Sequence, residues 1–533
     1  MSGPTEFDYI VVGGGSAGCV LANRLSRDPL RSVCLIEAGG TARSARVSIP
    51  ALLLSLYNNK RFDYAYSTEP EGRMNNRRIP VNRGKMLGGS SSINSMIYIR
   101  GAREDYDGWA AMGCTAWSYD KVLEVFRDLE NNLVGQDPRY HGFDGELYVD
   151  TARQPSPVSR MFVEAAKSVG LPQNDDFNGE TLYGAGIYNL TQRRGERWSS
   201  YRAFVQPIAD RKNLTVVTGA EVLALATEGR RATGLRVLRN GIEETLRCRR
   251  EIVLSAGSIG SPRILLASGI GPAAELKALG IDPVLDLPGV GKNLQDHVDG
   301  VVTLRSRNAL TMGLSARALP GILAAPLHYY SSRRGLMTSN YVEAGGFART
   351  RFAGQVPDIQ FHFLPAYRSH RGRLIETGHG YALHTCLLRP KSTGEVVLAP
   401  DGTRRNQLIR ANFFSDSTDL AVLSDGLRVA REILASPVFA PLDGKEILPG
   451  PSVRSETEMA AYLREKAATS FHPACTCKMG TDAMAVTDPD SLRVRGFENL
   501  RVADASIMPA LVSGNTNAPT MMIGEMASRM ILN

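Results

Sequence analysis

The sequence of 533 residues has few cysteines, few tryptophans and no long apolar run. Its seven cysteines form an odd and scattered set, which argues against a disulfide framework and favours reduced thiols in the cytoplasm. No stretch approaches the roughly 18 consecutive apolar residues that a membrane-spanning helix needs. The first residues lack a basic region and lead directly into glycines, so we expect no signal peptide. Low-complexity tracts are also missing, which excludes a disordered or collagen-like chain.

The excess of basic over acidic residues is also small. Sixty-two Lys and Arg stand against 54 Asp and Glu, a formal net charge of +8. The densest basic stretch, residues 230–250, is interrupted by Glu243 and Glu244, which indicates the solvated face of a β-meander. No polybasic tail or nucleic-acid module accompanies it, so we expect no nucleic-acid partner. The hydrophobic fraction of 43% is that of a large globular protein that needs no disulfide or metal to hold its core.

The chain opens with a strand, a glycine turn, a helix and a second strand. Residues 7–12 and 33–37 are apolar runs of buried-strand type, and residues 19–26 have a helical pattern. In such a βαβ unit the parallel sheet is covered by helices on both faces. The turn has the pattern GxGxxG, and an acidic residue stands nineteen positions after its last glycine. The candidate residues in this unit are Gly13, Gly15, Ser16, Ala17, Gly18 and Glu37.

This unit predicts a dinucleotide site. Small glycines let the backbone approach a pyrophosphate at the helix N-terminus, and the acid at the end of the second strand holds the ribose. A glycine turn that served packing alone would not need the strand, helix and acid around it. The spacing does not choose between FAD and a nicotinamide cofactor.

The rest of the chain predicts more of the first sheet and then a second sheet. Alternating apolar and polar residues dominate from about 301 to 455, which predicts a separate and mostly antiparallel sheet that includes residues 359–363 and 395–398. Residues 256–263 are predicted to open a helix, with Pro262 near its first turn, and a terminal helix is predicted over 518–531. The other predicted strands are 214–218, 234–238, 251–255 and 500–503.

Two segments near the C-terminus offer polar side chains. Asp504 follows the last predicted strand, where it either bonds the ribityl chain of a flavin or caps the next turn, and the sequence leaves both open. The helix that opens near Asn517 would direct its positive end at the anionic edge of a reduced flavin. His472 is interpreted as a histidine held in one orientation, although most lone histidines are structural. Beside it, Cys475 and Cys477 are spaced too closely for zinc and lack a second cluster, so we expect no metal.

From the glycine turn onward the sequence resembles the glucose–methanol–choline (GMC) oxidoreductases nearly end to end. Residues 83–94 (RGKMLGGSSSIN) resemble the first signature of that family, and residues 257–271 resemble the second. Residues 288–297, the block around His472 and residues 513–520 are also typical segments. Several long motifs in the family's order make the resemblance specific. It is greatest for bacterial alcohol and polyol dehydrogenases of the L-sorbose and choline dehydrogenase type.

The resemblance implies FAD as the cofactor and a sheet of the substrate domain that covers the flavin. The fold class is therefore α/β, or α+β overall, with a Rossmann-like FAD-binding domain in discontinuous segments and a substrate domain on a mostly antiparallel sheet. The FAD-binding domain is expected to comprise residues 5–155, 195–300 and 456–533. The substrate domain is expected to comprise residues 156–194 and 301–455.

The resemblance also assigns roles to individual residues. His472 takes the place of the family's catalytic histidine, and Asn517 falls where members carry a second histidine or an asparagine. Asn94 lies in the loop that touches the isoalloxazine. Ile93 stands where members with a covalent flavin carry a histidine, so FAD without a covalent link is expected. The remaining cofactor positions are Arg83, Gly88 and Gly89 in the first signature, Val222 at the adenine, and Asp504, Ala505, Pro519 and Thr520 near the flavin's pyrimidine edge.

Three other histidines are less informative. His297 is interpreted as structural, with its ring satisfied in a loop near the cofactor. His362 and His384 lie on predicted strands of the second sheet, where lining a pocket competes with the commoner core or surface position.

The implied reaction is the oxidation of an alcohol to the carbonyl. His472, as a neutral base, would take the hydroxyl proton while the α-hydride passes to flavin N5, and Asn517 would hydrogen-bond the substrate oxygen. The substrate would be a sugar, a polyol or another primary or secondary alcohol, and the acceptor a quinone or dioxygen. An alcohol oxidase that releases peroxide is the nearest alternative, and a hydroxynitrile lyase ranks lower. The expected location is the cytoplasm, with peripheral contact to the inner membrane as an option.

Overall fold

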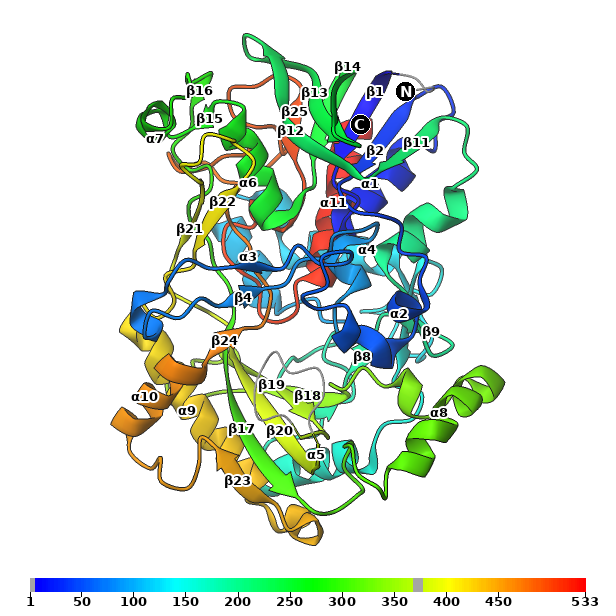
Figure 1. Cartoon of the computed structure of the whole chain (residues 1–533), viewed down its shortest axis with the longest axis vertical. Coiled ribbons are helices and arrows are strands. Elements are labelled where there is room, and N and C mark those ends of the chain that lie inside the picture. The colour runs from blue at the N-terminus through cyan, green and yellow to red at the C-terminus, as the bar shows by residue number, and fades with distance from the viewer. Residues whose placement is uncertain (1–4, 368–376) are drawn as a thin grey trace.

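The computed structural model describes residues 5–367 and 377–533, and Figure 1 shows two regions stacked along the long axis. Each region is built around one large sheet. The labelled N- and C-terminal ends lie together in the upper region. Segments from both ends of the chain therefore share one layer of the fold.

The upper sheet begins with the βαβ unit that the sequence predicts. β1 (Glu6–Val12) pairs in parallel with β2 (Val33–Glu37), and α1 (Ser16–Leu25) connects them. Parallel strands of this kind are buried on both faces, which explains their continuous apolar runs. The strand order is β11-β2-β1-β14-β13-β12, with β25 beside β14. The further strands are β11 (Leu214–Thr218), β12 (Ala220–Glu228), β13 (Arg231–Arg239), β14 (Ile242–Leu254) and β25 (Leu500–Val502).

The basic stretch at residues 230–250 lies on an antiparallel meander, as predicted. β13 pairs antiparallel with both β12 and β14, and its arginines are partly paired, as in the 2.6 Å contact between Arg236 and Glu243. β14 is much longer than the predicted strand at 251–255. Its first half exposes alternate charged side chains to solvent, and such a half-polar segment gives no apolar run to detect.

The lower sheet confirms the predicted antiparallel architecture. Its strand order is β23-β17-β20-β19-β18-β7, with β24 beside β17, and its neighbouring strands pair antiparallel. Helices α5 (Pro157–Ser168) and α9 (Ser417–Leu434) pack against it, and Phe162 stacks on Phe363 with ring centroids 4.8 Å apart. The strands are β7 (Gly184–Ile187), β17 (Val298–Ser306), β18 (Ala344–Ala348), β19 (Ile359–Leu364), β20 (His379–Leu387), β23 (Lys445–Leu448) and β24 (Ala468–Thr469).

The region from 301 to 455 differs from the prediction in two respects. It contains two long helices, α8 (Leu319–Ser332) and α9, which the alternation elsewhere in the region obscured. The predicted strand at 395–398 exists as β21 (Glu395–Leu398), but it pairs with β22 (Gln407–Arg410) in a separate hairpin that packs on α6 (Gly257–Ala267). Alternation reports which face of a strand is buried and not which strand it pairs with. The exact domain bounds stay a prediction.

Shorter elements complete the fold. The terminal helix α11 (Asn517–Leu532) packs along α1 in the upper region. Among the helices in the described residues, none combines the length and the apolar content needed to cross a bilayer. The other helices are α2 (Ala45–Ser48), α3 (Arg103–Ala111), α4 (Tyr119–Leu129), α7 (Ala273–Ala278) and α10 (Glu456–Lys466). The short strands are β3 (Tyr66–Ser67), β4 (Pro80–Val81), β5 (Glu130–Asn132), β6 (Leu147–Thr151), β8 (Asn189–Leu190), β9 (Gln192–Arg193), β10 (Glu196–Arg197), β15 (Ile270–Gly271) and β16 (Leu285–Asp286).

Candidate functional site

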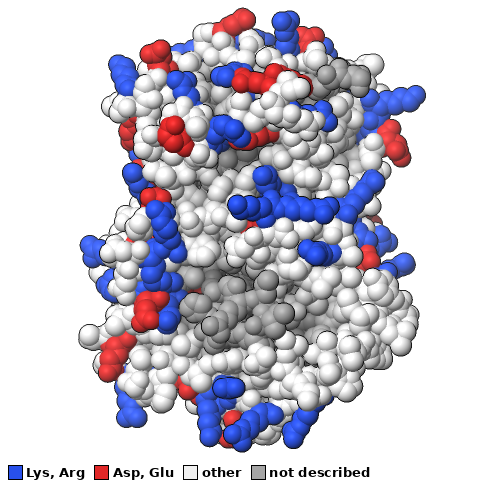
Figure 2. All heavy atoms as spheres, in the orientation of Figure 1, with Lys and Arg blue, Asp and Glu red and all other residues white. Residues whose placement is uncertain are grey.

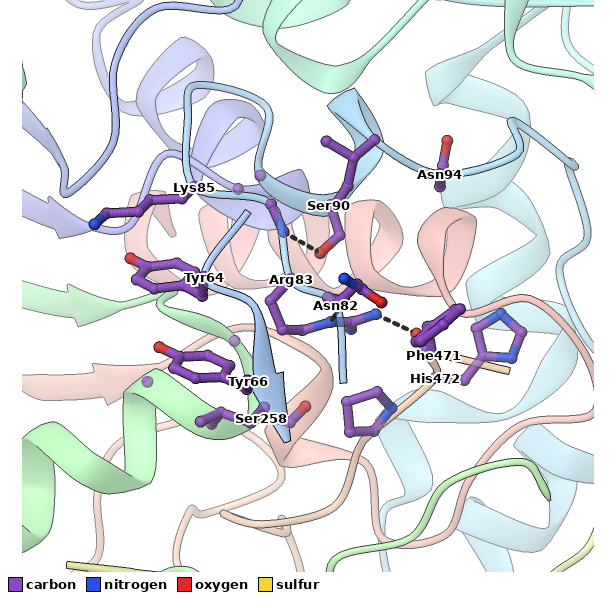
Figure 3. Close-up of a pocket in the computed structure, with 18 of the residues that line it drawn as sticks. Tyr64, Tyr66, Asn82, Arg83, Lys85, Ser90, Asn94, Ser258, Phe471 and His472 are labelled. Carbon is purple, nitrogen blue, oxygen red and sulfur yellow. Dashed lines mark hydrogen bonds between the residues drawn. The ribbon is translucent and has the colours of Figure 1, made fainter. Parts of the chain in front are cut away.

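A cavity of about 1410 Å³ extends from the glycine turn of the upper sheet to β19 and β20 of the lower sheet. Pockets for a single small ligand usually measure about 300–1,000 Å³, so this cavity has room for a larger group and a small molecule beside it. Figure 3 shows part of its wall, where Arg83 and Asn94 of the first signature lie near His472, a residue almost 400 positions later in the sequence.

The glycine turn forms one end of the cavity. A Cβ atom at Gly18 would lie 1.9 Å from the carbonyl oxygen of Gly13, so only glycine lets the helix approach the strand so closely. A Cβ atom at Gly15 would instead point into open space, with its nearest neighbour, the Ser255 carbonyl oxygen, 3.8 Å away. Gly15 caps α1 without a side-chain hydrogen bond, which leaves the first N–H groups of the helix facing the cavity. These features fit the phosphates of a dinucleotide.

Glu37 lies at the end of β2 beside this turn. Its carboxylate accepts hydrogen bonds from the backbone N–H of Gly14 at 3.0 Å and of Gly39 at 2.7 Å. Burial raises its pKa to about 7, against the lowering effect of these two bonds. The carboxylate is therefore fixed in direction at the cavity wall, where a ribose hydroxyl would be its natural donor.

Asp504 caps the neighbouring turns, which is one of the two alternatives that the sequence left open, and its position at the cavity leaves the other a prediction. It lines the cavity, and its carboxylate also caps two turns. One oxygen accepts from Ser506 N at 2.8 Å, and the other accepts from Gly257 N at 2.9 Å and from Ser261 Oγ at 2.6 Å. Burial raises its pKa. Through these three hydrogen bonds the Asp504 carboxylate fixes the conformation of the cavity wall.

Most of the predicted cofactor residues line the cavity, and three lie behind its wall. Gly18, Gly88 and Pro519 are not part of the lining, because they serve the close packing of the surrounding turns and of the first turn of α11. The residues that do line it are Gly13, Gly15, Ser16, Ala17, Glu37, Arg83, Gly89, Asn94, Val222, Asp504, Ala505 and Thr520.

Arg83 and Asn94 contact other parts of the protein more than the sequence suggested. The guanidinium of the half-buried Arg83 donates to the backbone carbonyl of Phe471, the residue before His472 (Figure 3). The amide oxygen of Asn94 accepts from Met96 N at 3.0 Å and from Arg197 Nη1 at 2.8 Å. Arg83 thus connects the first signature loop to the histidine turn.

His472 lies in a turn that follows β24, and its ring is buried at the cavity wall. Its backbone N–H donates to Asp296 Oδ1 at 2.8 Å. Burial lowers the pKa of the ring well below its ordinary value, and the neighbouring His297, His362 and Arg83 act in the same direction. The ring is therefore neutral at physiological pH and has one nitrogen free of hydrogen.

His297, which the sequence analysis took as structural, determines which nitrogen that is. Its Nε2 lies 3.1 Å from the carbonyl oxygen of Leu388, which only accepts hydrogen bonds, so Nε2 carries the proton. Burial lowers its pKa to about 3, so its Nδ1 is a bare acceptor. The Nδ1 of His472 lies 3.0 Å away and must donate to it. The Nε2 of His472 then carries the lone pair that can act as a base.

Asn515, which the sequence analysis did not single out, is the asparagine beside that base. Its Nδ2 lies 3.3 Å from His472 Nε2, whereas the amide oxygen of Asn517 accepts from Ser16 Oγ at 2.8 Å. The predicted partner of the histidine was thus placed two residues too late, at the first residue of α11 instead of in the turn before it. Asn517 still lines the cavity, on the side of the glycine turn.

The other end of the cavity combines apolar and aromatic side chains with polar groups, several of them from the lower sheet. His362 on β19 and His384 on β20 are cross-strand partners, and both line the cavity. The carboxylate of Asp299 accepts from Ser470 Oγ at 3.1 Å and lies 3.5 Å from His384 Nδ1. The apolar and aromatic lining residues at this end are Leu53, Leu54, Tyr57, Val301, Tyr341, Val342, Leu364, Leu448 and Phe471.

Cys475 and Cys477 are packing groups in this turn. Both are completely buried, and burial raises the pKa of each thiol far above its ordinary value. Within the described residues, no group of three or more metal-ligating side chains forms a site.

Comparison with known proteins gives one consistent result. The N- and C-terminal family models of the GMC oxidoreductases match residues 7–299 and 390–524. The chain is 43% identical to an alcohol dehydrogenase (acceptor) of Pseudomonas putida, over 99% of this chain and 96% of that protein. It is 39% identical to the mitochondrial choline dehydrogenase of Mus musculus, over 99% of this chain and 90% of that protein.

Solved structures agree with this. The crystal structure of pyridoxine 4-oxidase from Mesorbium loti superposes with a TM-score of 0.87 at 32% identity, over 98% of both chains. A formate oxidase superposes with a TM-score of 0.91 at 27% identity, over 100% of this chain and 99% of that one. The likeness therefore extends over the whole fold.

Proposed function

Because the chain belongs to the GMC oxidoreductase family, we propose that His472 and Asn515 form the site at which this FAD-dependent enzyme oxidises an alcohol. FAD dependence and action on CH–OH donors follow from the family. The observation that supports this pair of residues is the 3.3 Å separation between Asn515 Nδ2 and His472 Nε2 at the cavity wall.

The two side chains present one donor and one acceptor to an alcohol hydroxyl. Asn515 Nδ2 donates and His472 Nε2 accepts, so a hydroxyl that lies beside both atoms and replaces their mutual hydrogen bond accepts from the amide and donates to the imidazole. As the proton moves to Nε2, the amide N–H stabilises the developing negative charge on oxygen. The imidazole is neutral beforehand because burial lowers its pKa, so it is available as a base throughout the physiological range.

FAD would be held by the lining residues of the upper region. The glycine turn and the N-terminus of α1 would take the pyrophosphate, Glu37 the adenosine ribose, and the backbone at Val222 the adenine. When bound, FAD supplies the hydride acceptor. Ile93 offers no side chain for a covalent link, so we propose that FAD is bound without one.

The substrate would be an alcohol with an apolar body. Nine aromatic and aliphatic side chains line the wall beyond His472. A sugar or polyol would need a hydrogen-bond partner for each hydroxyl, because an unpaired buried hydroxyl is costly. The polar groups at this end include Asp299, Asn340, His362, His384 and Ser470, and an alcohol would place its hydroxyl among them and its apolar body against the leucine and aromatic side chains.

Electrons would pass on to a quinone. The relative from Pseudomonas putida is named as an acceptor-dependent dehydrogenase, and this chain shares 43% of its residues. Dioxygen is the alternative acceptor. We accordingly place the protein in the cytoplasm, at the periphery of the inner membrane.

Anaerobic reduction of the purified holoenzyme tests the proposal. The flavin absorbance should bleach with apolar primary alcohols and bleach less with sugars, polyols or choline. His472→Ala should keep its FAD and lose most of this reduction. Bleaching by His472→Ala at the wild-type rate would contradict the assignment of the base. Release of peroxide in air, without turnover of a quinone, would contradict the acceptor.

A further inference from the structure

We propose that helix α8 and its flanks are a docking surface for an anionic lipid bilayer. Seven of the seventeen large apolar side chains that are exposed in the described residues fall between residues 310 and 336. Such clustering on one short segment is unusual, because exposed apolar residues on soluble proteins are normally scattered. They are Leu310, Leu314, Leu319, Leu323, Leu327, Tyr330 and Leu336.

Within α8 the exposed leucines and Tyr330 form one stripe. Leu319, Leu323 and Leu327 recur every four positions and are 51%, 72% and 72% exposed, and Tyr330 continues the stripe. The opposite face of the helix is apolar too, and Ala325 and Tyr329 are buried in the protein. A helix that is apolar on two opposite faces is normally covered on both. We therefore expect the outer face of α8 to be buried against a binding partner.

The charges around the helix suit phospholipid headgroups. The fourteen residues of α8 include no Asp, Glu, Lys or Arg. Residues 300–342 include five arginines and no acidic residue, and Arg317 and Arg334 flank the two ends of the helix. Figure 2 shows the surface at the lower right, where α8 lies in Figure 1, as largely white. An apolar stripe with basic ends is typical of a helix that lies in the plane of an anionic membrane interface.

A second copy of the chain fits this surface less well. Two copies joined by a twofold axis would bring identical patches together, and with them the arginines at both helix ends. Like charges in a contact of that kind repel. A bilayer supplies both the apolar phase and the negative charge.

The surface is connected to the cavity. The turn Leu336–Thr338 packs between α8 and the turn Pro50–Ser55, and Asn340, Tyr341 and Val342 just beyond it line the cavity. The hydroxyl of Tyr341 donates to the carbonyl of Ala51 at 2.8 Å. A protein docked through α8 would thus hold the apolar end of its cavity close to lipid-dissolved quinones and alcohols. This link rests on the proposed function, whereas lipid binding does not.

Vesicle flotation of the holoenzyme tests the surface. The protein should float with vesicles of phosphatidylcholine and phosphatidylglycerol, and less with phosphatidylcholine alone. The double variant Leu323→Ser, Leu327→Ser should partition about tenfold more weakly or worse, because two leucine side chains no longer enter the apolar phase. Arg317→Gln with Arg334→Gln should reduce binding to anionic vesicles only, and added salt should do the same. Leu30→Ser is the matched control, since Leu30 is 89% exposed and lies far from α8 in the sequence.

The outcomes separate the surface from the reaction. Turnover with a soluble dye should be unchanged in the double variant, which shows that it is folded, while turnover with quinone in vesicles should fall. Wild-type protein that does not float, or a double variant that floats as well as wild type, overturns the proposal. A wild-type dimer that the double variant converts to a monomer, without vesicle binding, would identify a second copy as the cover. Flotation without quinone turnover would contradict the proposed acceptor but would still support α8 as the lipid-binding surface.

Discussion

Removing the acceptor that His297 offers to His472 should slow the oxidation while the cofactor stays in place. In His297→Leu the Nδ1–H of His472 loses its partner 3.0 Å away and stays buried. Leaving a buried donor unsatisfied costs about 1–3 kcal/mol. The ring therefore shifts toward the other tautomer, whose Nε2 carries hydrogen and cannot accept a proton from the substrate. Since about 1.4 kcal/mol corresponds to tenfold, the rate of flavin reduction should fall about tenfold to a hundredfold.

The matched variant is His297→Asn, whose amide oxygen again offers an acceptor near the position of Nδ1. It should recover most of the rate that His297→Leu loses. Anaerobic stopped-flow reduction at several alcohol concentrations separates the limiting rate from substrate affinity, and only the rate should change. A purely structural role for His297 would lower FAD content or thermal stability in both variants alike. Full activity in His297→Leu, or equal loss in both variants, would refute the tautomer argument.

Three further predictions follow from the same geometry. Asn515→Ala should lower the rate of flavin reduction about a hundredfold, as expected for the loss of one donor to a developing oxyanion, whereas Asn517→Ala should chiefly weaken FAD retention. Stopped-flow reduction measures the first effect and flavin content the second. The reverse pattern would contradict the placement of Asn515 at the base. Gly15→Ala should weaken FAD binding about tenfold or more without unfolding the protein, because the added methyl group would occupy the cavity. The control is Gly108→Ala on α3, where the added methyl group would also meet open space. Titration of the apoprotein with FAD measures the affinity of both variants. The free energy of unfolding should decrease on acidification, because His297 has a folded-state pKa of about 3 against 6.5 when unfolded. The contribution of His297 to this free energy is fully present above about pH 6.5 and decreases as the pH falls toward 3. At pH 5 it is smaller by about 2 kcal/mol. The temperature of FAD release at pH 7 and pH 5 checks this, and His297→Leu should lose less than wild type.

The βαβ unit and its glycine turn were predictable because their signals are local. Continuous apolar runs, a glycine pattern and an acid at fixed spacing all lie within residues 7–37, and the backbone geometry leaves little choice of arrangement. The antiparallel character of the lower sheet was predictable from alternation for the same reason.

The details of the site depended on contacts that no local pattern carries. His297 and His472 are 175 residues apart, and their contact exists only because β17 and β24 are neighbours in the lower sheet. Asn517 was assigned from the resemblance alone, whereas the position of Asn515 beside His472 depends on the conformation of the turn before α11. Helix α8 gave no amphipathic signal because both of its faces are apolar.

The turn that carries His472 is fastened to both regions of the molecule. β24 pairs with β17 in the lower sheet, and a few residues later the backbone N–H groups of Cys475, Cys477 and Met479 donate to carbonyls of residues 505–507 in the upper region. Arg83 adds a bond to Phe471 between these two attachments. Opening the two regions relative to each other would break these hydrogen bonds and move His472 away from His297 and Asn515. Catalysis should therefore need no domain opening, and the protein packed in a crystal lattice should still turn over alcohol that diffuses in.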